Sequence, residues 1–211
     1  MTITLHHLEY SRSSRIIWLL EELGTPYEMV RHQRDPKSFR SPDALYAVHP
    51  LGKAPAIVVD GHVMGESGAI IEYLIERFGD GRLAPASLAD RPAYLEWLHF
   101  AEGTLAMPII LNALSPMFGG LGGGLEPFIG GEVIKLLDHC EKSLADRAFL
   151  VGDDLSGADI NLAYLIEVAD ANGLLDSRPA LAAYIARLRD RPAYRKSLEL
   201  GGPIVLGATR S

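Results

Sequence analysis

The hydrophobic pattern of this chain changes character near residue 90, and the change limits the folds that the chain can adopt. The first eighty residues alternate between strand-like and helix-like segments in the order β-α-β-α-β-β-α. From Arg91 onward, apolar residues recur at helical spacing and no segment has a convincing strand pattern. We therefore expect a small α/β domain over residues 1–80, a linker at 81–87 and an all-helical domain over 88–211.

Turn and capping residues mark the elements of the first part. Gly24 ends a helical pattern, Asp60-Gly61 is typical of a tight hairpin turn, and Ser67 is a preferred N-cap residue. These signals predict strands at 3–5, 27–32, 56–59 and 63–64, and helices at 16–23, in the stretch ending at Val48, and at 67–78.

In the second part, Pro92 suits the first turn of a helix that continues through Trp97 and Phe100. Gly119–Gly124 is glycine-rich but follows no strand and lacks the GxGxxG spacing, so we interpret it as a link between helices and not as a phosphate loop. Another helix is predicted from 127 to 144. Ser156 and Asp159 resemble a capping box at the start of a further helix.

Composition excludes several classes of function. The one cysteine, Cys140, cannot form an internal disulfide, a CxxC pair or a multi-cysteine zinc site. A net charge of −7 without a basic run argues against nucleic acid or anionic membranes as partners. No apolar run approaches the ~20 residues that span a bilayer. The adjacent His6 and His7 would point to opposite faces of a strand and so cannot chelate one metal ion, and we expect no metal site. We also predict a soluble, cytoplasmic protein.

Four motifs, in order, resemble those of the cytosolic glutathione transferases. They are Ser11–Arg15 leading into Trp18–Gly24, then His49–Pro55, Gly65–Ser67 and Ser156–Asp159. The SRSxR start is similar to a serine-type subgroup of that superfamily. The resemblance implies a thioredoxin-like N-terminal domain, an all-helical C-terminal domain and a homodimer, with glutathione as cosubstrate.

The resemblance also implies a glutathione site. Ser67 and nearby backbone N–H groups at a helix N-terminus would bind the γ-glutamyl carboxylate, and Glu66 would accept from its ammonium group. Ser67 as a simple N-cap is the alternative. Ala54, before a cis-Pro55, would pair its backbone with the cysteinyl part. Two basic residues are candidates for the glycine carboxylate: Lys53 and Arg40.

Ser11 is the candidate that stabilises the glutathione thiolate. Its hydroxyl would donate to the sulfur at the turn into the first helix, where the helix dipole adds to the effect. The alternative for Ser11 is a purely structural role as an N-cap residue. Tyr10 and Ser13 are the other candidates for the hydroxyl that donates to the sulfur. Because no cysteine lies at positions 10–14, the sulfur must come from the bound cosubstrate.

The second substrate is expected to be a small hydrophobic electrophile bound between the domains. Four residues are spaced to share a helix face there: Glu102, Ala106, Met107 and Leu111. The alternative for the three apolar ones is plain core packing. Glu102 on a mostly apolar face needs a partner, and the resemblance suggests the γ-glutamyl ammonium group bound in a neighbouring subunit.

The expected activity is therefore conjugation of glutathione to hydrophobic electrophiles, with reduction of organic hydroperoxides as a related reaction. Two alternatives stay open at this point. One is a non-catalytic binding or regulatory module that keeps the fold. The other is a glutathione-dependent isomerase of the zeta type, against which Arg15 argues, because it follows Ser13-Ser14 where that type has Ser-Ser-Cys.

Overall fold

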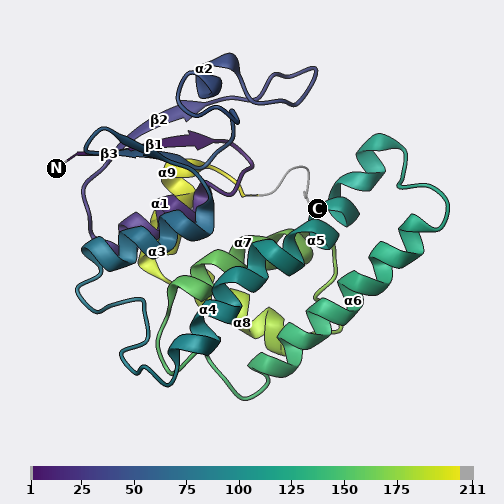
Figure 1. Cartoon of the computed structure of the whole chain (residues 1–211). Coiled ribbons are helices and arrows are strands. Elements are labelled where there is room, and N and C mark those ends of the chain that lie inside the picture. Colours follow the sequence, from purple (N-terminus) through teal and green to yellow (C-terminus); the bar gives the residue numbers. More distant parts are fainter. Residues whose placement is uncertain (1, 205–211) are drawn as a thin grey trace. The chain divides into compact units, whose positions relative to one another are not determined.

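The computed structural model describes residues 2–204, which Cα packing divides into two units (Figure 1). The first unit runs from the N-terminus to Arg82 and also takes in the segment that begins at Asp190. The second unit extends from Leu83 to Arg189. This division differs from the predicted boundaries, since the last helix groups with the first unit and not with the helical one.

The first unit is built on a four-stranded mixed sheet in the order β2-β1-β3-β4. β1 and β2 are parallel, whereas β1 and β3, and β3 and β4, are antiparallel. The four strands predicted from the sequence are all present, with β1 longer than expected. Their bounds are β1 Ile3–Leu8, β2 Glu28–His32, β3 Ala56–Val59 and β4 His62–Met64.

Three helices pack around this sheet: α1 (Ser14–Leu23), α2 (Asp43–Tyr46) and α3 (Ser67–Phe78). α2 lies on the side of the sheet opposite α1 and α3 (Figure 1). Gly24 ends α1 in the left-handed conformation with φ of 66°, as its position after the apolar pattern predicts.

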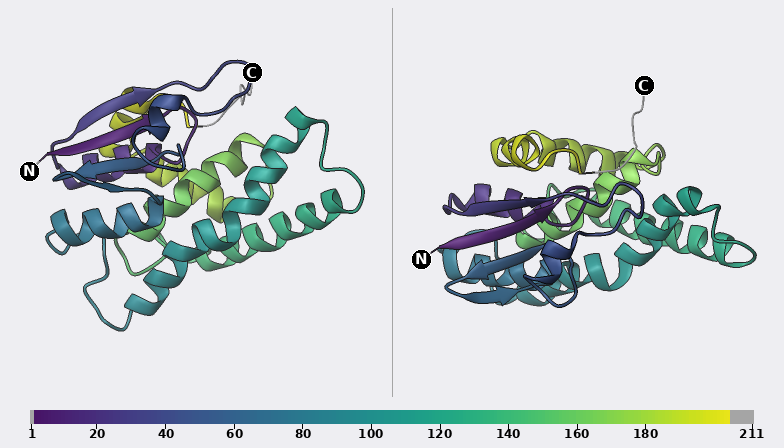
Figure 2. Two further views of the ribbon diagram at one scale, coloured as in Figure 1. Left: turned by 45° about the horizontal axis from the view of Figure 1, so that its top comes forward. Right: turned by 90° about the horizontal axis from the view of Figure 1, so that it is seen from above.

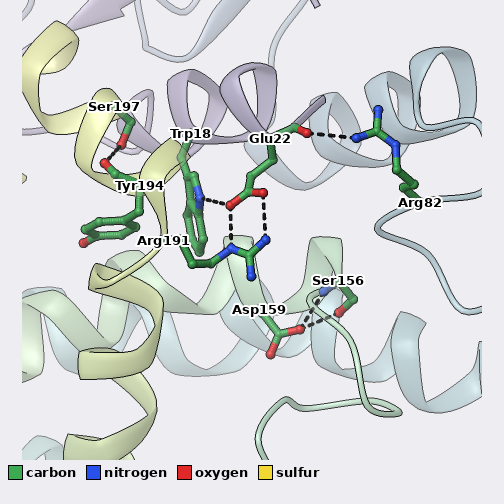
Figure 3. A network of polar contacts seen from close by, with 8 residues as sticks. All are labelled: Trp18, Glu22, Arg82, Ser156, Asp159, Arg191, Tyr194 and Ser197. Carbon is green, nitrogen blue, oxygen red and sulfur yellow. Dashed lines mark hydrogen bonds and ion pairs between the residues drawn. The ribbon is translucent and has the colours of Figure 1, made fainter. Parts of the chain in front are cut away.

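The last described helix, α9 (Pro192–Gly201), packs along α1, so that α1 lies between α3 and α9 (Figure 2). Trp18 of α1 meets the ring of Tyr194 edge to face, with centroids 4.9 Å apart. Glu22, also on α1, accepts from Arg191 Nε at 2.6 Å and Nη2 at 2.9 Å (Figure 3). The Trp18 indole N–H donates to the same carboxylate at 2.9 Å. An aromatic contact and a bidentate ion pair therefore hold α9 in the first unit.

Helices and turns make up the second unit, and no strand lies among its described residues. None of the described helices in either unit is long and apolar enough to cross a membrane. Gly119–Gly124 joins two helical segments, in agreement with the sequence interpretation. The elements are α4 Arg91–Phe100, the π-helix η1 Ala101–Leu105, α5 Ala106–Leu114, the 3₁₀-helix η2 Ser115–Phe118, α6 Leu125–Leu144, α7 Gly157–Ala171 and α8 Pro179–Arg189.

The predicted capping box begins α7, a helix buried on every side over most of its length. Asp159 accepts from the Ser156 backbone N–H at 2.9 Å and from its hydroxyl at 2.7 Å (Figure 3). The other carboxylate oxygen accepts from Leu150 N–H at 2.9 Å and from the Tyr184 hydroxyl at 3.0 Å. Four donors thus satisfy a carboxylate that is shielded from solvent.

Candidate active site

The sheet topology brings three predicted site segments to one end of the first unit. In the register, His6 near the end of β1 faces Ala56 at the start of β3, and Ile57 faces Met64 at the end of β4. The turn after β1, the loop before β3 and the turn after β4 therefore meet at the same end of the sheet.

The turn after β1 holds Ser11 in a network of short hydrogen bonds. Its hydroxyl donates to Leu8 O at 2.7 Å, lies 2.7 Å from the Ser13 hydroxyl and accepts from Ser13 N–H at 3.2 Å. The side chain is only 8% exposed. α1 begins at Ser14 with Ser13 as N-cap residue, and no side chain caps it. The interpretation of Ser11 as an ordinary N-cap is therefore wrong.

Ser13 continues this network into the interior. Its hydroxyl lies 2.8 Å from His7 Nδ1 and accepts from Leu8 N–H at 3.2 Å. On the other side of the ring, His7 Nε2 lies 2.9 Å from the carbonyl of Gly201, at the end of α9. Burial is the largest influence on the His7 ring and lowers its pKa, so the ring is neutral at pH 7.

A clamp from the segment after β2 fixes the same turn. Tyr10 has a φ of 51°, a left-handed conformation that is uncommon for a residue with a bulky side chain. Arg34 Nε donates to Glu9 O at 3.2 Å, Nη2 to Tyr10 O at 3.1 Å and Nη1 to Phe39 O at 3.1 Å. The guanidinium carbon also lies 4.7 Å from the centre of the Phe39 ring. The three carbonyl contacts stabilise the strained conformation at Tyr10.

At the start of α3, Glu66 occupies the N-cap position with φ of 63°, and its side chain is exposed. Ser67 is the first helical residue and makes no capping hydrogen bond, so the simple N-cap alternative for Ser67 is wrong. Its buried hydroxyl instead accepts from Arg15 Nη1 at 2.9 Å. The sequence did not predict this contact of Arg15, because nothing local links it to a serine 52 positions away.

The loop before β3 contains a cis peptide bond between Ala54 and Pro55, as predicted. Ala54 is half-buried, whereas Lys53 and the more distant Arg40 are exposed. Gly52 has a φ of 56°, and a Cβ atom there would come within 2.6 Å of the Tyr46 ring. Glycine suits this position, because the left-handed φ and the close Tyr46 ring both disfavour a side chain there.

The four residues proposed for the second substrate lie in η1 and α5, which follow α4 directly in the chain. Ala106 is buried and Met107 is 65% exposed, while Glu102 and Leu111 are half-buried. In the π-helix η1, Ala106 N–H bonds to Ala101 O, five residues earlier, so the regular α-helical spacing of this face is interrupted. The four side chains therefore differ in solvent exposure. No group of three or more metal-binding side chains occurs among residues 2–204.

Comparison with known proteins gives a consistent result. Residues 5–82 match the family of glutathione S-transferase N-terminal domains, and residues 126–187 match that of glutathione S-transferase C-terminal domains. "Glutathione S-transferase 3" of Schizosaccharomyces pombe is 32% identical over 93% of this chain and 87% of its own length. "Glutathione S-transferase 1" of Saccharomyces cerevisiae is 27% identical, over 93% and 94% respectively.

Solved structures agree with the sequence relatives. A glutathione S-transferase of Actinobacillus pleuropneumoniae superposes with a TM-score of 0.88 at 32% identity, covering 99% of this chain and 96% of its own. A sphingomonad glutathione S-transferase, solved with glutathione bound, superposes with a TM-score of 0.79 at 26% identity, covering 94% and 98%.

Proposed function

The chain belongs to the glutathione S-transferase family and is a glutathione transferase, and we propose that it conjugates glutathione to small hydrophobic electrophiles. The observation that supports this reaction is the meeting of three loops at one end of the sheet. One contains the buried Ser11 hydroxyl, one the backbone of Ala54, and one the Ser67 hydroxyl at a helix N-terminus. These three groups can bind a thiol, an extended peptide backbone and a carboxylate, respectively.

Ser11 is the proposed donor to the thiolate. In this structure its proton bonds to Leu8 O, and we propose that it turns to the sulfur when glutathione binds. A hydroxyl donor and the N-terminal dipole of α1 both favour the charged sulfur over the neutral thiol. A hydrogen bond to a charged group contributes about 1.5–3 kcal/mol, which corresponds to a lowering of the thiol pKa by about 1–2 units.

Both ends of glutathione have proposed partners in the same unit. Ser67 accepts from Arg15, which leaves its own proton to donate to the γ-glutamyl carboxylate. The exposed Glu66 carboxylate accepts from the γ-glutamyl ammonium group. Ala54 pairs with the cysteinyl backbone. Lys53, and in a lesser role Arg40, binds the glycine carboxylate, since both side chains are exposed and cationic.

For the second substrate, we assign the surface to Glu102, Met107 and Leu111, with the buried Ala106 supporting it from beneath. The electrophile loses its leaving group to the attacking sulfur, and the protein supplies proximity. An organic hydroperoxide is a second type of substrate for the same thiolate. There the sulfur takes oxygen and releases the alcohol, and a second glutathione yields the disulfide and water.

A homodimer in the cytoplasm completes the proposal. A dimer is usual in the family, and it would allow Glu102 to meet the γ-glutamyl ammonium group bound in a second copy. Cys140, the one cysteine in the chain, is buried, which is compatible with a reducing compartment. Light scattering of the purified protein measures its mass, for which the expected value is twice 23.0 kDa.

The central test measures conjugation of glutathione to a chromogenic aryl halide and the thiol pKa of the bound glutathione. The wild-type protein should bind immobilised glutathione and catalyse the reaction. Ser11→Ala should lower kcat about tenfold or more and raise the bound thiol pKa by about 1–2 units, whereas Tyr10→Phe should leave both near wild type. If Tyr10→Phe is impaired and Ser11→Ala is not, the donor has been misassigned.

A further inference from the structure

A continuous chain of polar contacts runs from the end of α9 to the proposed thiolate donor. The carbonyl oxygen of Gly201 lies 2.9 Å from His7 Nε2, and His7 Nδ1 lies 2.8 Å from the Ser13 hydroxyl. The Ser13 and Ser11 hydroxyls are 2.7 Å apart. All four residues are buried. None of the predicted roles at this site uses His7, so its two contacts require an explanation.

The chemistry of the groups fixes the direction of the hydrogen bonds. A carbonyl oxygen can only accept, so His7 Nε2 carries a proton and donates to Gly201 O. In the neutral ring, Nδ1 then has a lone pair and must accept from the Ser13 hydroxyl. The Ser13 oxygen accepts in turn from Leu8 N–H at 3.2 Å. Leu8 O also lies 3.1 Å from the Ser13 hydroxyl, but it takes the Ser11 proton at 2.7 Å. His7 Nδ1, at 2.8 Å, is the nearer acceptor and takes the single proton of Ser13.

We propose that His7 is a positioning residue for the reaction, because it takes the Ser13 proton and so makes Ser11 the hydroxyl that donates to glutathione sulfur. This inference rests on the proposed role of Ser11. With its proton turned inward, Ser13 does not donate to the Ser11 oxygen, which is held in place by Ser13 N–H. Of the two hydroxyls, only that of Ser11 has a proton free to turn from Leu8 O to the ligand.

The surroundings of the ring keep it neutral. His7 faces the end of α9, and Glu9, Arg31 and His32 are the charged or titratable groups that act on it. Burial outweighs these influences and holds the pKa of the ring below its ordinary value. A neutral ring is what the acceptor role at Nδ1 requires.

α9 supplies the other anchor of the ring. Gly201 approaches so closely that a Cβ atom there would come within 2.7 Å of Ile17 Cδ1 and 3.4 Å of His7 Cε1. The helix is held in turn by the ion pair of Arg191 with Glu22 on α1. The orientation of the ring is thus set by a helix whose last residue lies 194 positions after His7.

Two substitutions separate the two contacts of His7. In His7→Asn the amide oxygen occupies the place of Nδ1 and can accept from Ser13, but the side chain is too short to reach Gly201 O. In His7→Gln the amide nitrogen occupies the place of Nε2 and can donate to Gly201 O, but the acceptor at Nδ1 is lost. The Ser13 proton must then turn to Leu8 O, where it competes with Ser11, or to the Ser11 oxygen. The measurements are kcat, KM, the thiol pKa of bound glutathione and the melting temperature.

His7→Gln should raise the bound thiol pKa by about one unit and lower kcat about tenfold with little change in KM for glutathione. His7→Asn should keep the wild-type thiol pKa while the melting temperature falls. A wild-type thiol pKa in His7→Gln, or an equal effect of both variants, would overturn the proposal. If neither variant folds, Ser13→Ala gives the decision, since it removes the hydroxyl that His7 holds and must shift the thiol pKa in the same direction.

Ser11→Ala, measured in the same assays, separates failure of this inference from failure of the proposed function. If Ser11→Ala leaves the thiol pKa unchanged, the donor itself is wrong. If Ser11→Ala raises the thiol pKa and His7→Gln does not, the donor is right and His7 has only a structural role.

Discussion

Arg15 Nη1 donates a 2.9 Å hydrogen bond to Ser67 Oγ, across 52 positions of sequence and with both residues buried. The contact joins α1 to the first turn of α3. It also determines what the Ser67 hydroxyl can do, because an oxygen that accepts from a guanidinium keeps its own proton to donate. A serine at a helix N-terminus, backed by a cation and with a free proton, is suited to bind a carboxylate.

Ser67→Ala should weaken glutathione binding and also destabilise the fold. Loss of a hydrogen bond to a carboxylate costs about 1.5–3 kcal/mol, so Kd should rise about 10–100-fold. Arg15 loses one buried acceptor, which should lower the free energy of unfolding by about 1–3 kcal/mol. Calorimetric titration and chemical denaturation measure the two effects. Ser87→Ala, in an exposed loop, is the matched control. An unchanged Kd in Ser67→Ala would remove the residue from the binding site.

Short-range features of this fold could be predicted from the sequence. The hairpin at Asp60-Gly61, the cis bond before Pro55 and the capping box of Ser156 with Asp159 all occur as expected. The first and third depend on contacts within a few residues, which side-chain chemistry determines locally. The cis bond followed from the family resemblance.

Long-range contacts could not be predicted in this way. The helical spacing from Arg91 onward agrees with α9 but does not predict that α9 packs on α1. Periodicity identifies which residues share a face of a helix and not what that face contacts. The pairs Arg15–Ser67 and His7–Gly201 join segments far apart in the chain. The helix boundary at Ser67 also lies one position from the alternative interpretation, in which Ser67 is the N-cap residue. In the structure Glu66 is the N-cap residue, so the Ser67 hydroxyl is not needed to cap the helix.

Arg34→Lys should impair catalysis more than stability. A lysine ammonium group is a point donor and cannot reproduce the planar contact with the carbonyls of Glu9, Tyr10 and Phe39. The Tyr10 turn should relax and displace Ser11, with a fall in kcat/KM of about tenfold. Arg31→Lys, at an exposed position on β2, is the control. Equal kinetics in the two variants would show that the clamp has no effect on the reaction.

Acid should destabilise the first unit through its histidines. Burial lowers the pKa of His6, His7 and His32 below the ordinary value of about 6.5. The unfolded chain therefore binds protons that the folded chain excludes. Stability is complete above a pH of about 6.5 and falls as the pH drops through that value, by at most about 1.4 kcal/mol per pH unit for each histidine.

Denaturant unfolding at a series of pH values between about 8 and about 5 measures this dependence. His32→Gln should reduce the slope below a pH of about 6.5, because it removes one of the three groups and the stacked pair that His32 forms with His6. A steeper slope in this variant would contradict the expected direction of the pH dependence.

Arg191→Ala should loosen α9. Its bidentate partner Glu22 is only 10% exposed, so removing the cation leaves a mostly buried carboxylate that retains the Trp18 indole N–H (Figure 3). We expect a loss of about 1–3 kcal/mol in the free energy of unfolding and a change in Trp18 fluorescence. Arg195→Ala removes an exposed ion pair with Asp190 from the same helix and should cost less than about 0.5 kcal/mol. Similar losses in both variants would mean that Arg191 does not anchor the helix.

Cys140 should not react with thiol reagents while the protein is folded. Its side chain is fully buried in α6, and burial raises the pKa of its thiol to about 12, so almost no thiolate is present at neutral pH. Labelling with a chromogenic disulfide should proceed only as fast as the chain unfolds, and at once in denaturant. Cys140→Ala should therefore retain full conjugating activity while losing some stability to the cavity that it leaves. Rapid labelling of one thiol per native chain, or loss of activity in Cys140→Ala at unchanged stability, would mean that the reacting sulfur is not supplied by glutathione alone.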